Sequence, residues 1–161
     1  MMDPVLIGHL EHVYDLLARS FLRYAVEASG PVIGDDWDRR AMEALKVWVA
    51  ADRGILGKVE EILAAHKFHP LAPVWSVQYS QYHFLSSFYL LGPVARKMEP
   101  QAALLEAEAA ALALWPEAEA LASQAAAHSC NHLTAVQALS LARPKEVPKP
   151  APKKGVSASR W

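Results

Sequence analysis

Apolar residues recur at every third or fourth position over most of this chain, which is the spacing of a core-facing helix surface. The first such stripe predicts a helix over residues 4–28. Asp3 and Pro4 mark its start. The Asp3 carboxylate can cap the helix, and proline is favoured at the first helical position because the backbone N–H there has no partner within the helix. A Ser-Gly-Pro sequence at 29–31 ends it. The stripe consists of Leu6, Leu10, Val13, Leu17 and Tyr24.

A second helix is predicted from Gly34-Asp35-Asp36 to about Lys67. Acidic residues lie in its first turn, where the positive end of the helix dipole stabilises negative charge. Two members of its stripe are not apolar, namely Asp52 and His66. The full stripe is Ala41, Leu45, Trp48, Asp52, Ile55, Val59, Ile62 and His66.

The third helical segment is aromatic and apolar on nearly every side, which is typical of a helix buried on most of its surface. We expect it to begin at Pro73. Pro93 and Pro100 interrupt the pattern, so either the helix kinks and continues to about Leu114 or a separate helix follows. No cluster of loop-forming residues divides the two pieces, which favours the kinked continuation.

A fourth helix is predicted over 116–142, because Pro116 suits its first turn and Arg143-Pro144 ends it. Short connections between four helices predict an all-α fold, an antiparallel up-down-up-down four-helix bundle with a kinked third helix. The bundle domain spans 1–143. Residues 144–161 are rich in proline and lysine and are expected to form a disordered C-terminal tail. The fourth stripe is Leu121, Ala125, His128, His132, Ala135 and Leu139.

Composition and charge narrow the function classes. Hydrophobic residues make up 53% and charged residues 20%, as in ordinary globular proteins. Six basic residues and one acidic residue give 143–161 a net charge of +5, so the remainder carries −6 and is a poor nucleic-acid binder. The longest apolar run, 84–95, is too interrupted to span a membrane. The single cysteine favours a reducing, cytoplasmic location.

The candidate chemistry is a histidine pair. His128 and His132 stand one turn apart on one helix face, the spacing that helical metal sites use. In an antiparallel bundle Asp52 falls at the same height, so the three side chains could bind one iron or zinc ion, and His9 is a more distant candidate ligand. The alternative interpretation is that Asp52 pairs with one or both histidines inside the core and binds no metal.

Acids and histidines facing inward from the second and fourth helices resemble the ferritin-like superfamily. That resemblance implies a di-iron site with a Glu on each of two helices and a Glu-x-x-His on each of the other two. This sequence departs from that pattern at three places. Asp52 is followed by Arg-Gly-Ile, so no histidine stands three residues later, and the residue three before His128 is Ala125 instead of Glu. The third helix has Gln78 and Gln81 where the pattern has a carboxylate. We therefore expect a degenerate or at most mononuclear metal site, with no di-iron oxidase activity.

The alternative function is a non-enzymatic protein–protein interaction or adaptor module. Its tail, 144–161, would be the docking peptide, with Arg160 and Trp161 as contact residues, since both types are favoured interface anchors. A passive linker explains the same composition. Apolar residues outside the stripes predict a homodimer surface. They are Val5, Leu16, Val47 and Val49.

Overall fold

The computed structural model describes residues 2–145, and over that range the chain is helical, as predicted. It contains five α-helices and one short 3-10 helix, and its only β-type pairing is an isolated bridge between Val32 and Ser86. Residues 146–161, which include Arg160 and Trp161, lie outside the described residues. The helices are α1 (Pro4–Ala18), α2 (Phe21–Glu27), α3 (Asp36–Ala65), η1 (Val77–Tyr82), α4 (Ser87–Ala111) and α5 (Pro116–Ala142).

The single helix predicted over 4–28 is wrong, because the chain breaks at Arg19 and Ser20. Ser20 is extended, and its hydroxyl accepts a hydrogen bond from the Arg23 backbone N–H at 3.2 Å, which caps α2. The Arg23 guanidinium in turn donates to the Ala18 carbonyl at 3.2 Å. These two bonds satisfy backbone groups that a helix break would otherwise leave free.

The third helix begins at Ser87 rather than at Pro73. Residues 66–86 form a long connection that contains only η1, and Ser86 caps α4 through a hydrogen bond from the Tyr89 backbone N–H at 3.4 Å. From there α4 runs without interruption through Pro93 and Pro100 to Ala111. The expectation that 101–111 continues the third helix is therefore confirmed.

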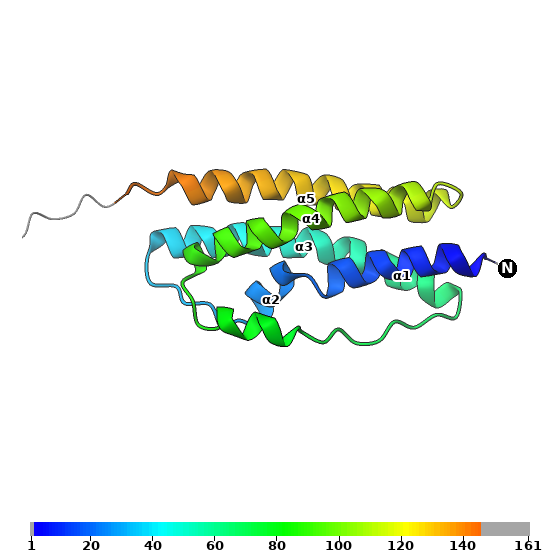
Figure 1. Cartoon of the computed structure of the whole chain (residues 1–161), viewed down its shortest axis with the longest axis horizontal. Coiled ribbons are helices and arrows are strands. Elements are labelled where there is room, and N and C mark those ends of the chain that lie inside the picture. Colours follow the sequence, from blue (N-terminus) through cyan, green and yellow to red (C-terminus); the bar gives the residue numbers. More distant parts are fainter. Residues whose placement is uncertain (1, 146–161) are drawn as a thin grey trace, which may run out of the picture.

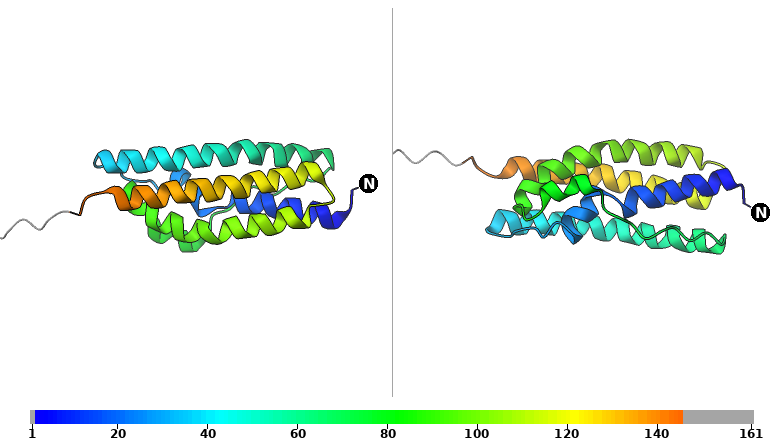
Figure 2. Two further views of the ribbon diagram at one scale, coloured as in Figure 1. Left: turned by 90° about the horizontal axis from the view of Figure 1, so that it is seen from above. Right: turned by 60° about the horizontal axis from the view of Figure 1, so that its bottom comes forward.

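The long connection also changes the direction of the third helix. Asp38 at the start of α3 hydrogen-bonds the backbone of Phe88 at the start of α4, so these two ends lie together. At the other end of the bundle the ring of His66 meets that of Trp115, just before α5, at 5.2 Å. Thus α3 and α4 run in the same direction, and α1 and α5 run opposite to them (Figure 1, Figure 2). The predicted up-down-up-down order is wrong, because 66–86 returns the chain along the bundle before α4 begins.

The end of α3 is well defined. Lys67 adopts a left-handed conformation with φ of 62°, and its N–H bonds the Ala64 carbonyl at 2.9 Å. The N–H of Phe68 bonds the Leu63 carbonyl, also at 2.9 Å. This pair of bonds is a Schellman motif, which satisfies the last carbonyls of a helix and here releases the chain into the connection.

The buried apolar side chains form two separate clusters rather than one core. The first joins α1 to the second half of α3, the end of α4 and the start of α5, and includes Leu10, Leu17, Val59 and Leu112. The second joins α2 to the first half of α3, the start of α4 and the end of α5, and includes Phe21, Trp48, Leu91 and Val136. The division falls near mid-height, where α1 ends and α2 begins.

Candidate functional site: a buried polar layer

Buried polar side chains from three helices occupy the level between the two apolar clusters. Asp52 of α3 and Ser129 of α5 are completely buried, and Gln101 of α4 is 7% exposed. Polar groups at the centre of a helical bundle lose their contact with water, and that loss is costly unless a partner replaces it. These three side chains therefore mark a level at which polar groups interrupt the apolar core.

The contacts on either side put these residues at one height. The Trp48 ring stacks on His132, with centroids 5.6 Å apart and planes 18° apart. One turn further along α3 is Asp52, and one turn back along the antiparallel α5 are His128 and Ser129. Asp38 and Phe88 are in contact at the starts of the parallel helices α3 and α4. Asp52 lies 14 residues after Asp38 and Gln101 lies 13 residues after Phe88, so the two are at nearly the same level.

In the described part of the chain, six fully buried side-chain nitrogen or oxygen atoms lack a hydrogen-bond partner, and all but that of Trp48, which packs in the second apolar cluster, belong to this layer. The six atoms are Trp48 Nε1, both Asp52 carboxyl oxygens, Gln101 Nε2, His128 Nδ1 and Ser129 Oγ. Such atoms are rare in folded proteins and each one costs on the order of 1–3 kcal/mol. Five of the six lie at this one level, so the layer is where the core most lacks hydrogen-bond partners from the protein.

Burial governs the charges of this layer. Removal from water raises the pKa of Asp52 to about 7, and the charge of Arg23 acts in the opposite direction. Burial also lowers the pKa of His132, and the neighbouring His128 lowers it further. Both shifts favour the uncharged form, because a charge in this interior loses its hydration.

The structure corrects the expected orientation of the histidine pair. The inward position of α5 is Ser129, whereas His128 and His132 are both half-buried at the edge of the helix interface. One residue corresponds to about 100° of rotation on a helix, so the buried face of α5 lies beside the predicted stripe. The rings of the two histidines are 6.1 Å apart. Since neither Asp52 oxygen has a hydrogen-bond partner, the proposed Asp52–histidine hydrogen bond is not formed.

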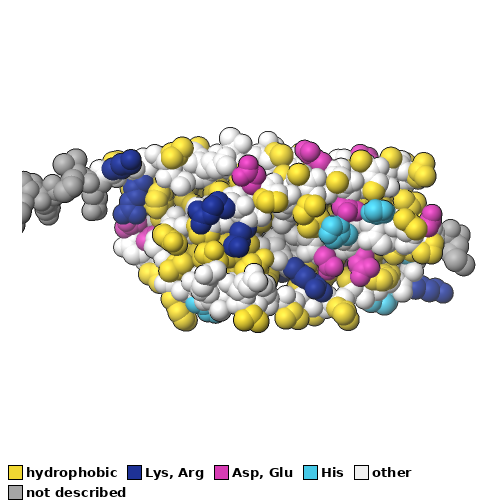
Figure 3. Space-filling model, viewed as in Figure 1, with side chains coloured by type: hydrophobic (Ala, Val, Ile, Leu, Met, Phe, Trp, Pro, Cys, Tyr) yellow, Lys and Arg dark blue, Asp and Glu magenta, His cyan; other side chains and the backbone are white. Residues whose placement is uncertain are grey.

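Among the described residues, no three His, Cys, Asp or Glu side chains are placed together to hold a metal ion. Asp52 and His128 share a level without a third such ligand. His9 lies elsewhere, on α1, where its Nδ1 is 2.7 Å from one oxygen of Glu108 of α4. His12 Nδ1 is 2.7 Å from the other oxygen of the same carboxylate. This surface contact gathers histidine and acidic side chains near the N-terminal end of the molecule (Figure 3).

The sequence analysis did not identify Gln101, Ser129 or Glu108 as candidates. Gln101 falls three residues after Met98 and four before Leu105, both of which are buried, so the apolar spacing of α4 would have pointed to it. Ser129 interrupts an alanine-rich stretch and looks like an ordinary small residue. Glu108 becomes recognisable only when its helix is known to lie beside α1.

The predicted dimer residues are divided between surface and core. Val5 and Val47 are exposed, and Leu16 is half-buried. Val49 is 2% exposed and packs within the second apolar cluster, so it is not available to a partner.

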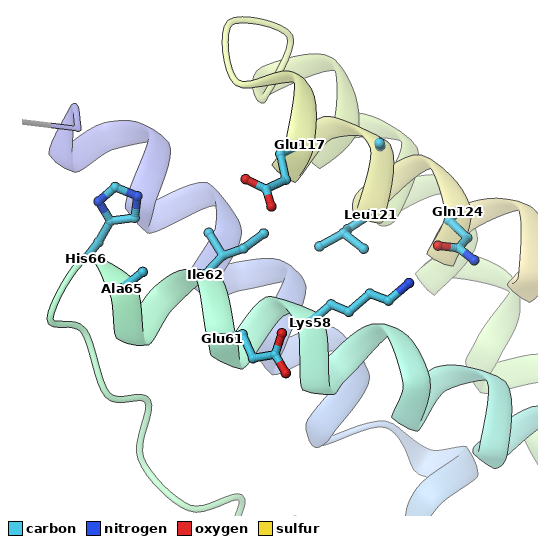
Figure 4. Close-up of a pocket in the computed structure, with 9 residues that line it drawn as sticks. Lys58, Glu61, Ile62, Ala65, His66, Glu117, Leu121 and Gln124 are labelled. Carbon is cyan, nitrogen blue, oxygen red and sulfur yellow. The ribbon is translucent and has the colours of Figure 1, made fainter.

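A surface pocket of about 670 Å³ lies between α3 and α5, away from the polar layer (Figure 4). Ile62 and Leu121 form its apolar floor, and Glu61 and Glu117 face it from opposite helices. Lys58 extends across it. Charges of both signs over an apolar floor specify no single ligand class. Of the two polar members of the second helix's predicted stripe, His66 lines this pocket and Asp52 does not.

Comparison of the chain with protein-family models, curated proteins and solved structures finds no match. Within residues 2–145, no helix has both the length and the apolar character needed to cross a lipid bilayer.

Proposed function

We propose that this chain is a ferritin-like bundle whose central site is reduced to the polar layer around Asp52. The order of its helices supports this proposal. Ferritin-like bundles have one long crossover connection among four long helices, and the segment 66–86 is such a crossover between the parallel helices α3 and α4.

The buried positions support it further. In the di-iron pattern, two helices each carry Glu-x-x-His and the other two each carry Glu. On α3 the acidic position is Asp52, with Ile55 three residues later. On α5 the buried polar position is Ser129, with His132 three residues later, and on α4 it is the amide Gln101. The level retains one carboxylate, which cannot balance two iron ions.

The single observation that carries the proposal is the buried, unpartnered carboxylate of Asp52. A carboxylate with an imidazole nitrogen and a hydroxyl nearby can hold at most one ion of iron or zinc, with His128 Nδ1 as the second protein ligand. With no second metal position, the layer lacks the means for di-iron oxidase chemistry. The proposed activity is therefore ion binding without turnover.

The test is titration of metal-free full-length protein with zinc or with iron(II) under anaerobic conditions. We expect retention of one equivalent after gel filtration and a higher melting temperature, because a ligand that binds only the folded state stabilises it. Asp52→Asn should abolish both effects, whereas Glu61→Gln, in the distant pocket, should leave them intact. Retention of no metal together with an unchanged melting temperature would falsify the proposal.

A second candidate function, a non-enzymatic interaction module, is favoured by the surface of the crossover. Leu71, Val74, Val77 and Phe84 are each more than 70% exposed, which is unusual for large apolar side chains so close in sequence. This candidate includes a homodimer and a partner bound through 144–161. Sedimentation velocity should show a dimer that becomes monomeric in a Leu71→Ser, Val74→Ser, Val77→Ser variant. A monomeric parent protein would exclude the homodimer.

A further inference from the structure

A second pocket, of about 420 Å³, opens where α1 ends, and we call it the α1–α4 pocket. It lies between the end of α1, the start of α2, η1 and the middle of α4. Its size falls within the range of pockets that bind small molecules. The helix break at Arg19 and Ser20 and the passage of the crossover over α2 together create it. The residues that the argument uses are Asp15, Arg19, Phe21, Tyr79, Lys97 and Leu104.

Aromatic rings form one wall of this pocket. The Phe21 ring meets Tyr79 edge-to-face at 5.0 Å, and it meets Tyr82 in the same manner at 4.9 Å. Phe21 is almost completely buried and fixes the wall from behind, whereas Tyr79 is half-buried and borders the opening. On the α4 side Leu104 is 46% exposed. The pocket thus offers aromatic and aliphatic surface on these two sides, beside polar lining residues such as Ser76 and Gln78.

Lys97 supplies the charge. Its ammonium group lies 5.5 Å from the ring centroid of Phe21, 5.7 Å from that of Tyr79 and 5.6 Å from that of Tyr82. Cation–π attraction holds the group against the rings but leaves its hydrogen-bond donors unused. Within residues 2–145 no carboxylate lies within ion-pair distance of Lys97.

The balance of charge favours an anion. Arg19 Nε is 3.3 Å from Asp15, so the only carboxylate in the wall is already paired. Lys97 is then an excess positive charge beside an apolar, partly sheltered wall, where a carboxylate is attracted more strongly than in open water. Basic side chains are visible over the middle of this face of the molecule (Figure 3).

We infer that the α1–α4 pocket binds a small aromatic carboxylate, whose ring lies on Tyr79 and Leu104 and whose carboxylate accepts hydrogen bonds from Lys97. Gln101 of the Asp52 layer also lines this pocket, but the two groups on which the assignment depends, Tyr79 and Lys97, lie outside that layer. Both the ring and the charge of the ligand are required, because the ring packs against Tyr79 and Leu104 and the carboxylate meets the excess positive charge of Lys97.

The probe is benzoate, added to the full chain and followed by calorimetry and by ligand-observed NMR. Saturable binding with a Kd of about 1 mM or tighter is expected. Benzamide has the same shape without the charge, and inorganic phosphate has charge without the ring, so each should bind at least tenfold more weakly. Absence of saturable benzoate binding overturns the inference, as does equal binding of benzamide or of phosphate.

Variants locate the site. Lys97→Met keeps the aliphatic stem and removes the charge, and should weaken benzoate binding at least tenfold. Lys58→Met removes a lysine from the pocket between α3 and α5 and is the matched control, which should bind as the parent does. Benzoate affinity that is unchanged in Lys97→Met, or reduced equally in Lys58→Met, overturns the assignment. The benzamide comparison uses the parent protein and therefore decides the charge requirement even if a variant does not fold.

Discussion

The carboxylate of Asp38 accepts a hydrogen bond from the backbone N–H of Phe88 at 2.9 Å, joining residues fifty positions apart. The same carboxylate accepts the Ser86 hydroxyl and the Gly34 backbone N–H, the latter at 2.9 Å. One buried acid thus holds the starts of α3 and α4 together and satisfies an otherwise free donor in the first turn of α4.

Replacement of Asp38 by alanine should lower the free energy of unfolding by about 3 kcal/mol, because it leaves buried donors without an acceptor. Chemical denaturation at pH 7 measures this loss. Asp36→Ala is the matched control: it removes an exposed acid from the same turn and should cost clearly less stability than Asp38→Ala. Equal losses in the two variants would show that Asp38 does not join the helices.

The Asp38 contact should also depend on pH. Burial alone raises the pKa of this carboxyl, but its hydrogen bonds from Ser86, Phe88 and Gly34 outweigh burial and hold the pKa below the ordinary value. A depressed pKa contributes stability that is complete above the ordinary pKa near 4 and disappears as the pH falls through the folded value. The stability difference between parent and Asp38→Asn should therefore shrink in strong acid.

Asp52 should have the opposite dependence. Its pKa of about 7 in the folded state exceeds that of the unfolded chain, so folding is penalised increasingly as the pH rises from about 4 to 7. In metal-free protein, Asp52→Asn should therefore gain about 2 kcal/mol more stability over the parent at pH 8 than at pH 5. Urea denaturation at both pH values measures this change. A gain that is independent of pH would mean that Asp52 is already ionised in the folded protein at pH 5.

The contact between Glu108 and the two histidines of α1 should be modest in energy. Because His9 and His12 are partly exposed, Glu108→Gln is expected to cost about 0.5–1 kcal/mol at pH 6. Glu106→Gln, an exposed change on the same helix, is the control and should be nearly neutral. A double-mutant cycle with His9→Ala and His12→Ala separates the two pairs. Coupling energies of zero would show that the carboxylate does not join α1 to α4.

Lys67 offers a stabilising substitution. It adopts φ of 62° at the Schellman position after α3, where side-chain sterics disfavour any residue except glycine. Lys67→Gly should raise the free energy of unfolding by about 1 kcal/mol. Lys67→Ala keeps the steric strain and serves as the comparison. A Gly variant no more stable than the Ala variant would contradict this explanation.

Periodicity predicted the long helices well where one face meets the core throughout. The helix predicted over 116–142 coincides with α5. The predicted end of the second helix lies two residues beyond the end of α3. Periodicity failed at the crossover, because Trp75, Tyr79 and Tyr82 follow a helical spacing yet pack on α2 from an extended strap and a 3-10 turn. Local spacing carries no information about such long-range packing.

The candidate site was predictable only in part. Asp52 is buried as its place in the stripe indicated, because α3 presents one continuous face to the core. The buried face of α5 lies one residue away from the predicted stripe, so Ser129 faces inward instead of His128. That face consists largely of alanines, which offer little apolar contrast from which its rotation could be predicted. Gln101 was missed because the third helix was predicted to start at Pro73 rather than at Ser87. With that start, Gln78 and Gln81, and not Gln101, were expected to lie near Asp52.

The separation of the apolar side chains into two clusters has a consequence for the dynamics of the bundle. Each cluster is held together by its own contacts, and the level between them contributes unsatisfied polar atoms rather than cohesion. The two ends of the molecule are therefore suited to open as separate cooperative units, each with its own amide-exchange rates. A guest at Asp52 would couple them, so that occupancy at the centre sets whether the ends fluctuate independently or together.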